Sequence, residues 1–219
     1  NYLSTHHRSS APIGIKLPKN PYYLMTILAC MESGVAYVPI RENYPQNRID
    51  QIKDESGFEQ LITMDFLSHI IEQNTPAACE LKSNAQDTLY TICTSGSTGK
   101  PKAVVVPRGA ITDFWKWCDN YFKDIDQSDR VLQVADFTFD ISLIDVGLFL
   151  TKGASLYFSK FAGNIFILAL EIEKNKITFL NTVVNNFNML LEDSVYSRAD
   201  LTSLKYVVMG GARFTTDRK

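Results

Sequence analysis

Net charge, long apolar runs and clustered metal-ligating residues are all scarce in this sequence of 219 residues. A formal net charge of −2 gives no electrostatic basis for binding nucleic acid. No apolar run reaches the length that crosses a bilayer, so no membrane partner is expected. The four cysteines are scattered, without a Cys-x-x-Cys pair or a histidine at ligand spacing. This pattern predicts no metal site and is typical of reduced thiols in the cytoplasm.

What the sequence does have is a regular alternation of short apolar runs and helical patterns. One helix is clearly marked, because Asn20 is an N-cap residue, Pro21 suits the first helical position and Gly34 suits the C-terminal cap. The alternation predicts an α/β fold with a largely parallel sheet. The charged segment 123–129 predicts a boundary between two lobes, residues 1–125 and 126–219.

Several features are predicted within this alternation. A helix over 65–73 is expected to be capped by Asp65. A helix over 109–122 and an apolar helix over 143–150 are expected in the middle of the chain, and short strands over 177–180 and 205–209 near its end. The residues expected to pack in the core from the helix over 109–122 are Ile111, Phe114, Trp115, Cys118 and Tyr121.

The most distinctive segment is a loop of small, hydroxylated and basic residues between two predicted strands. Glycines let the backbone approach a ligand closely, successive backbone N–H groups can form an anion site, and hydroxyl and ammonium groups add donors. These properties suit a polyphosphate, and the alternative is a hairpin loop without a ligand. The candidate phosphate-binding residues are Thr94, Ser95, Gly96, Ser97, Thr98, Gly99, Lys100 and Lys102.

The spacing of this loop differs from that of the NTPase phosphate loop, Gly-x-x-x-x-Gly-Lys-Ser/Thr, in which a helix follows the lysine. Here Gly96 and Gly99 are closer together, and Pro101 follows Lys100. Proline disfavours helical backbone in the residue before it, and an apolar β-like run over 103–106 comes next. The loop is therefore predicted to connect two strands.

Several motifs resemble those of adenylate-forming (AMP-binding) enzymes, which include the amino-acid adenylation domains of nonribosomal peptide synthetases, D-alanine–carrier-protein ligases and acyl-CoA ligases. Residues 90–103 (YTICTSGSTGKPKA) resemble their phosphate-loop signature, and 14–20, 33–40 and 44–48 their preceding motif. Residues 139–142 (FDIS) resemble the Phe-Asp-x-Ser motif of the amino-acid-activating branch. Residues 204–211 resemble the strand that ends near the adenine, where Gly210 and Gly211 would lie. The resemblance implies two stacked α/β lobes of the N-terminal domain.

The resemblance implies activation of an amino-acid carboxylate by ATP. The carboxylate attacks the α-phosphate, pyrophosphate leaves and an aminoacyl-adenylate forms, with transfer to the thiol of a phosphopantetheine carrier protein or domain expected next. Mg²⁺ is the second implied cofactor, with its ligands outside this sequence. Because carboxylates are poor nucleophiles, positioning and charge neutralisation must supply most of the acceleration.

Asp140 is the second informative residue. By the resemblance it pairs with the α-ammonium of the substrate, a group that fatty and aryl acids lack. An aspartate among apolar neighbours is costly to bury unless it is paired. The alternative role is an N-cap for the helix that follows, and the two roles are compatible.

The same alignment predicts a pocket for a substrate side chain. Its apolar members suggest a mostly apolar side chain of modest size, and ordinary core packing is the alternative for each of them. The candidate substrate-binding residues are Asp140, Ile141, Ile144, Asn181, Val208 and Gly210.

The sequence also departs from the superfamily pattern. Ala212 stands where a glutamate often follows the glycine pair, and residues 181–186 lack the usual proline-containing loop. The aromatic-Gly-x-Thr-Glu loop, the ribose-binding aspartate and the small C-terminal domain with its catalytic lysine are absent. The chain is therefore expected to be an internal piece that is inactive alone, and no catalytic residue is named. The alternatives are a fatty- or aryl-acid ligase and a non-catalytic binding lobe.

Overall fold

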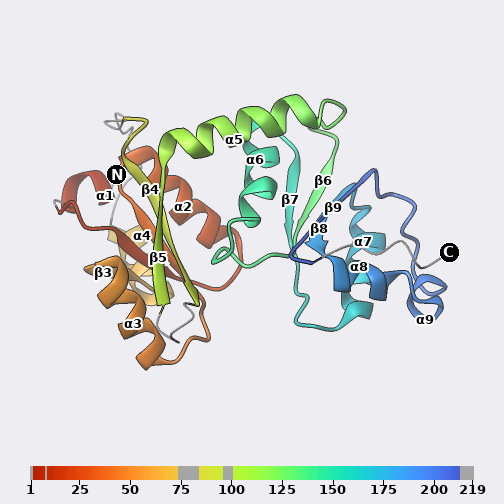
Figure 1. Ribbon diagram of the computed structural model, residues 1–219, viewed down its shortest axis with the longest axis horizontal. Coiled ribbons are helices and arrows are strands. Elements are labelled where there is room, and N and C mark those ends of the chain that lie inside the picture. The colour runs from red at the N-terminus through yellow and green to blue at the C-terminus, as the bar shows by residue number, and fades with distance from the viewer. Residues whose placement is uncertain (1, 8, 74–83, 96–100, 213–219) are drawn as a thin grey trace. The chain divides into compact units, whose positions relative to one another are not determined.

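A computed structural model describes residues 2–7, 9–73, 84–95 and 101–212, except the side chain of Ser95. The chain divides into two compact units, residues 1–114 and 115–219 (Figure 1). The division falls within helix α5 (Arg108–Tyr121). The predicted lobe boundary between residues 125 and 126 stays a prediction.

The first unit is built on a five-stranded sheet in the order β3-β1-β2-β4-β5. Strands β1, β2, β3 and β4 pair in parallel, whereas β4 and β5 form an antiparallel hairpin. The parallel part confirms the α/β expectation. The elements are α1 (Tyr2–His6), β1 (Ile13–Lys16), α2 (Pro21–Ser33), β2 (Tyr37–Ile40), α3 (Gln46–Ser56), β3 (Gln60–Ile62), α4 (Met64–Gln73), β4 (Thr88–Ser95) and β5 (Pro101–Pro107).

Helix α2 begins and ends where the sequence predicts. The Asn20 side chain accepts a hydrogen bond from the Tyr22 amide at 2.9 Å, which satisfies a helix N–H that has no partner within the helix. Pro21 is the first helical residue, and Gly34 closes the helix in the left-handed region with φ of 77°. Helix α4 differs from the prediction, because the Thr63 hydroxyl, and not Asp65, accepts from the Phe66 amide at 3.4 Å.

Replacing Asn20 with alanine is expected to destabilise the first unit by about 1 kcal/mol, because the Tyr22 amide loses its acceptor. Asn20→Asp keeps a side-chain oxygen at this position and serves as the control. Urea unfolding of the two variants, followed by circular dichroism, measures the difference. Equal midpoints for the alanine and aspartate variants would show that the cap contributes nothing.

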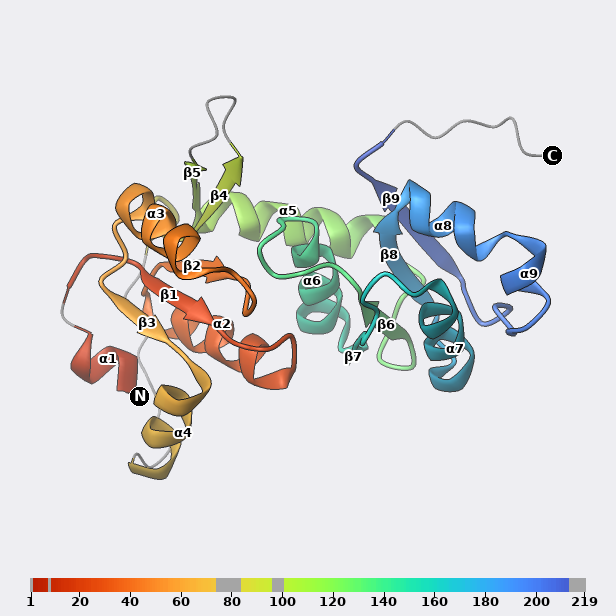
Figure 2. The same ribbon diagram turned by 90° about the horizontal axis from the view of Figure 1, so that it is seen from below.

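The second unit contains a four-stranded sheet in the order β7-β6-β8-β9, and all of its pairings are parallel. Its core on one face joins Leu132, Leu180 and Val207 to the helices α7, α8 and α9, and Figure 2 shows α6 on the opposite face. The elements are β6 (Arg130–Gln133), α6 (Ser142–Lys152), β7 (Ser155–Phe158), α7 (Ile165–Asn175), β8 (Phe179–Val183), α8 (Val184–Leu190), α9 (Asp193–Tyr196) and β9 (Tyr206–Gly210).

Side chains alternate between the two faces of this sheet. Leu180 therefore points toward α7, whereas its neighbours Phe179 and Asn181 point toward the face of α6. On that face Phe179 and Tyr206 pack edge-on against Phe122, which follows α5, with ring centroids 5.1 and 5.6 Å away. The alternation determines which residues of β8 and β9 meet α6, and so which residues form the site described below.

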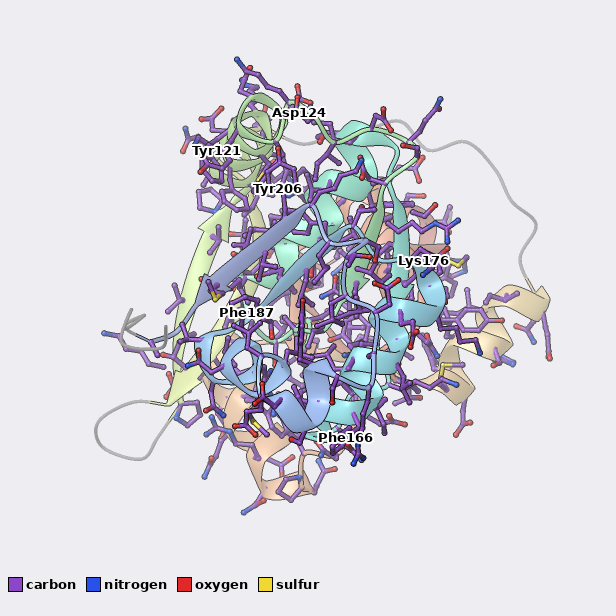
Figure 3. All side chains as sticks on the ribbon, turned by 90° about the vertical axis from the view of Figure 1, so that its right-hand side faces the viewer. Tyr121, Asp124, Phe166, Lys176, Phe187 and Tyr206 are labelled. Carbon is purple, nitrogen blue, oxygen red and sulfur yellow. The ribbon has the colours of Figure 1, made fainter. Side chains whose placement is uncertain are left out.

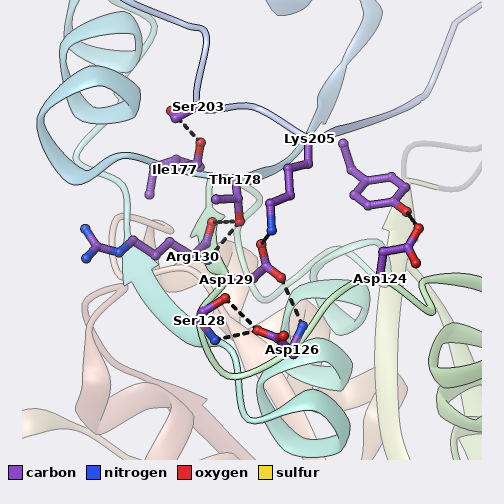
Figure 4. A network of polar contacts seen from close by, with 10 residues as sticks. Asp124, Asp126, Ser128, Asp129, Arg130, Ile177, Thr178, Ser203 and Lys205 are labelled. Atoms are coloured by element: carbon purple, nitrogen blue, oxygen red, sulfur yellow. Dashed lines mark hydrogen bonds and ion pairs between the residues drawn. The ribbon is translucent and has the colours of Figure 1, made fainter.

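A polar network joins the amino ends of β6, β8 and β9 (Figure 4). Asp129 is fully buried, and its carboxylate lies 2.8 Å from the ammonium of Lys205. The same carboxylate accepts from the Asp126 amide at 2.9 Å, and the Thr178 hydroxyl accepts from the Arg130 amide at 2.9 Å. Since a buried carboxylate is costly without partners, these contacts stabilise the amino edge of the sheet.

The core role predicted for the apolar side of α5 holds for Ile111 and Cys118, which are 6% and 0% exposed. It is wrong for Tyr121, which is 64% exposed and stacks on Trp117 with ring centroids 4.9 Å apart. Figure 3 shows Tyr121 at the surface of the second unit, with Asp124 and Tyr206 nearby. The next residue, Phe122, is buried in its place.

Two findings concern the described residues as a whole. None of their helices combines the length and the apolar character that a membrane span requires. Cys30, Cys93 and Cys118 are free thiols, as the scattered cysteine pattern predicts. Burial raises the pKa of the Cys30 thiol to about 12, although Arg108 opposes the shift, so this group stays protonated at neutral pH.

Candidate functional site

The predicted phosphate loop connects the two strands of the β4–β5 hairpin. Thr94 and Lys102 are directly opposite each other in the antiparallel register, and both side chains are exposed. Because opposite residues share one face of a hairpin, a hydroxyl donor and an ammonium lie together near the end of the hairpin where the loop connects the strands. Ser95 pairs with Pro101 through the backbone. Gly96, Ser97, Thr98, Gly99 and Lys100 lie outside the described residues.

The hairpin confirms the distinction from the NTPase loop, because the strand β5, and not a helix, follows the lysine. The Thr94 hydroxyl donates to the Lys102 carbonyl at 3.4 Å, a long contact that leaves the oxygen able to accept or donate elsewhere. Burial raises the pKa of the neighbouring Cys93 thiol, with Arg48 acting in the opposite direction. Cys93 therefore adds no negative charge beside Thr94 at neutral pH.

The predicted substrate-binding residues meet in the second unit, beside the carboxyl ends of β8 and β9. Asn181 is directly opposite Val208 in the parallel register, so both side chains lie on the face of α6. Gly210 is two residues further along β9 and shares that face. A Cβ atom at Gly210 would lie 3.0 Å from Cδ1 of Ile141, so the absence of a side chain lets Ile141 pack against the strand.

Asn181 also connects the sheet to the segment before α6. It is fully buried, and its Nδ2 donates to the Ile141 carbonyl at 2.8 Å. Ile144 is one turn further on and is 9% exposed. The structure therefore brings Ile141, Ile144, Asn181, Val208 and Gly210 together, and Gly211 follows with φ of 85°.

Asp140 adjoins this group and is exposed, so its carboxylate carries no cost of burial. The residue lies in a turn before α6. The N-cap alternative is wrong, because α6 starts at Ser142 and its cap position is Ile141, without a side-chain bond. The Asp140 carboxylate instead accepts from the Ile141 amide at 2.8 Å. It stays accessible to a cationic ligand.

One polar residue beside this group was not expected from the sequence. Gln133 is fully buried at the carboxyl end of β6, and its Nε2 donates to the Ala135 carbonyl at 2.8 Å. Its signal in the sequence is weak: a single amide in an otherwise apolar run over 131–135. A buried amide in a central strand requires partners, and those partners could not be named before the fold was known.

No group of three histidine, cysteine or acidic side chains in the described part of the chain could hold a metal ion. We therefore assign no Mg²⁺ site to these residues. The donors that the structure offers suit organic ligands: an ammonium and a hydroxyl for phosphate on the hairpin, and an exposed carboxylate beside a group of mostly apolar residues in the second unit.

Comparison with known proteins identifies the family to which the chain is similar. The sequence pattern of the AMP-binding enzyme family matches residues 1–219. Tyrocidine synthase 3 of Brevibacillus parabrevis is 32% identical over 219 residues, covering 93% of this chain and 3% of that protein. Bacitracin synthase 1 of Bacillus licheniformis is 31% identical over 194 residues, covering 86% of this chain and 4% of that protein. The chain thus spans a small part of these relatives.

Solved structures show the same fold. The N-terminal subdomain of Klebsiella oxytoca NpsA in complex with 3-hydroxyanthranilyl-AMSN has a TM-score of 0.78 and 26% identity, and the match covers 96% of this chain and 56% of that one. The AMPPNP-bound nonribosomal peptide synthetase FmoA3 has a TM-score of 0.82 at 22% identity, over 96% of this chain and 24% of that one. The resemblance found in the sequence is confirmed, and the chain belongs to the AMP-binding enzyme family.

Proposed function

We propose that the protein activates the carboxylate of an amino acid with ATP, forming an aminoacyl-adenylate and releasing pyrophosphate. The observation that carries this proposal is the meeting of Ile141, Asn181 and Gly210 beside an exposed Asp140. Open α/β sheets bind ligands beside the carboxyl ends of their strands, and this group lies there. An exposed carboxylate next to mostly apolar residues suits a ligand with an ammonium and an apolar side chain.

The hairpin is the proposed phosphate-binding element. Lys102 supplies positive charge and Thr94 a hydroxyl on the same face, and both would stabilise the charge on the β- and γ-phosphates and on the departing pyrophosphate. Gly96, Ser97, Thr98, Gly99 and Lys100 complete the proposed loop. Mg²⁺ would neutralise further phosphate charge, with ligands expected outside this sequence. Gly210 and Gly211 are the proposed neighbours of the adenine.

The chemistry that these residues contribute is binding and orientation. In the proposal, Asp140 holds the α-ammonium, which fixes the carboxylate relative to the α-phosphate. A bound amino acid in the correct orientation reacts faster because its translational and rotational entropy has already been lost. The aminoacyl-adenylate would then pass to the thiol of a phosphopantetheine carrier protein or domain. The structural likeness to the nonribosomal peptide synthetase FmoA3 supports this last step as an expectation for this protein.

A second candidate is activation of an aryl acid. It is favoured by the structural likeness to NpsA, whose subdomain was also solved with 3-hydroxybenzoyl-AMSN and anthranilyl-AMSN. This candidate gives Asp140 no partner, because an aryl acid such as 3-hydroxybenzoate has no ammonium to pair with its carboxylate.

Exchange of labelled pyrophosphate into ATP tests the two candidates in the full-length protein. The panel contains the proteinogenic amino acids, anthranilate and 3-hydroxybenzoate, with a reaction lacking any acid as the control. We expect exchange with one or a few amino acids that have apolar side chains of modest size. Exchange with 3-hydroxybenzoate and with none of the amino acids would reject the proposal in favour of an aryl-acid ligase.

A further inference from the structure

Gln133 and Asn181 occupy equivalent places on neighbouring strands. The parallel register pairs Val131 with Phe179, so one pleat further on Gln133 comes opposite Asn181 on the face of α6. Both side chains are fully buried. Each uses its amide nitrogen to donate to a backbone carbonyl of the segment 134–141, which connects β6 to α6.

The two donors hold opposite ends of that segment. Gln133 Nε2 donates to the Ala135 carbonyl at 2.8 Å, and Asn181 Nδ2 donates to the Ile141 carbonyl, also at 2.8 Å. Asp140 lies between the two attachment points. Since backbone freedom is the main cost of ordering a segment, fixing both ends reduces the freedom that the Asp140 carboxylate must lose when a ligand binds.

The middle of the segment is ordered by its own turns. The Asp136 carboxylate accepts from the Thr138 amide at 2.9 Å, and the Phe139 amide donates to the Asp136 carbonyl at 3.0 Å. The buried Ser142 hydroxyl donates to the Phe139 carbonyl at 2.7 Å. These turns give the segment its shape, whereas Gln133 and Asn181 attach that shape to the sheet.

We propose that Gln133 is a positioning residue for amino-acid binding, which acts with Asn181 by fixing the segment that carries Asp140. The inference rests on the proposed function, because it requires Asp140 to bind the substrate ammonium. Gln133 itself does not touch the substrate. A loss of this attachment weakens substrate binding in the ground state and the transition state equally, so it raises KM and leaves kcat nearly unchanged.

The carbonyl oxygens of the two amides provide a way to separate positioning from folding. Oε1 of Gln133 and Oδ1 of Asn181 have no hydrogen-bond partner among the described residues. An unpaired buried acceptor is destabilising, so replacing the amide with an apolar group of similar shape has a small net effect on stability. Gln133→Met therefore removes the attachment to Ala135 while the protein stays folded.

The test measures pyrophosphate exchange in the full-length protein with the amino acid that gives the highest exchange in the panel. We expect Q133M to raise the amino-acid KM about tenfold, with the ATP KM and kcat within about twofold of the parent protein. Amide hydrogen exchange within 135–141 should become faster. Should Q133M fail to fold, Q133N retracts the donor by one methylene and gives the same readouts.

The matched control is Asn175→Leu. It removes a bond of the same kind, from Nδ2 of Asn175 to the Glu171 carbonyl at 2.9 Å, in the same unit but outside the segment. An unchanged amino-acid KM in folded Q133M, or an equal rise in N175L, would overturn the positioning role. Asp140→Asn tests the proposed function separately. If D140N keeps the parent exchange, the ammonium site is wrong, whereas loss in D140N with no change in Q133M rejects this inference alone.

Discussion

Asp140→Asn is expected to lower kcat/KM for the amino acid in pyrophosphate exchange by roughly 30-fold to several thousand-fold. This range corresponds to about 2–5 kcal/mol, the usual effect of truncating one partner of a hydrogen-bonded charge pair. Asparagine has nearly the same shape as aspartate, so the change removes the charge and little else. The exposed position of Asp140 means that the fold itself should tolerate the substitution.

The measurement compares exchange over a range of amino-acid and ATP concentrations. The KM for ATP should stay within about twofold of the parent value, because the proposed phosphate-binding residues are on the β4–β5 hairpin. Asp193→Asn is the control, since it removes an exposed aspartate of the same unit from α9. Asp140→Glu keeps the charge and should retain part of the activity. Full amino-acid-dependent exchange in D140N would contradict the proposed role of this carboxylate.

Lys205→Met is expected to produce the largest loss of stability, about 3 kcal/mol in the free energy of unfolding. The Asp129 carboxylate is fully buried and lies 2.8 Å from the Lys205 ammonium, so removing the ammonium leaves a buried charge without its counterion. Trp115 and Trp117 are the two tryptophans of the sequence and both belong to the second unit. Urea unfolding of the 219-residue chain followed by tryptophan fluorescence therefore reports on this unit.

Lys176→Met is the matched control for this prediction. Lys176 also pairs with an aspartate, Asp200, at 3.1 Å, but the two side chains are 58% and 43% exposed. Exposed ion pairs contribute about 0–1 kcal/mol, so the K176M variant should differ little from the parent protein. Equal destabilisation of K205M and K176M would show that burial of Asp129 does not determine the effect.

The pH dependence of K205M follows from the two pKa shifts. Burial acts to raise the pKa of Asp129, but hydrogen bonds from Lys205, the Asp126 amide and Thr178 outweigh it and lower the pKa. The hydrogen bond to Asp129 raises the pKa of Lys205. The stability that comes from the lowered pKa of Asp129 is present above the pKa that this group has in the unfolded chain. It is lost as the pH falls through the pKa of the folded state. The stability that comes from the raised pKa of Lys205 is present below the pKa that this group has in the unfolded chain. It is lost as the pH rises through the pKa of the folded state.

The difference between the parent protein and K205M should therefore be largest between about pH 4 and pH 10, the unfolded pKa values of aspartate and lysine. It should shrink on both sides of that window. A difference that stays constant down to about pH 2 would show that the ion pair does not cause the stabilisation.

Local signals in the sequence predicted the elements whose causes are local. Asn20, Pro21 and Gly34 fix the limits of α2 through capping and backbone preference alone, and Pro101 after Lys100 indicates a strand instead of a helix. The family motifs pointed to Ile141, Asn181 and Gly210, which the structure places near one another. Their role in substrate binding stays a prediction.

The features that could not be predicted depend on contacts between distant residues. Tyr121 and Phe122 are adjacent and similar, and the packing of Phe122 against Phe179 and Tyr206 decides that Phe122 is the buried one. In our proposal, the position of Asp140 depends on the hydrogen bonds from Gln133 and Asn181 to the segment before α6. The role of Gln133 could be recognised only once the neighbouring strands were known. The strand order β7-β6-β8-β9 cannot be deduced from any single segment of the sequence.

In the second sheet, the stabilising polar network and the proposed substrate site lie at opposite ends of the strands. The Asp129–Lys205 network lies at the amino ends, whereas Val208 and Gly210 lie three and five residues beyond Lys205 along the chain, about 10 and 16 Å at the rise of an extended strand. Free-energy effects of substitutions at that separation generally add. In the proposed function, substitutions at Val208 or Gly210 would change which substrate side chain is accepted, while changes at the amino edge would restore lost stability independently. If the proposed site holds, the unit would suit stepwise laboratory evolution of substrate choice.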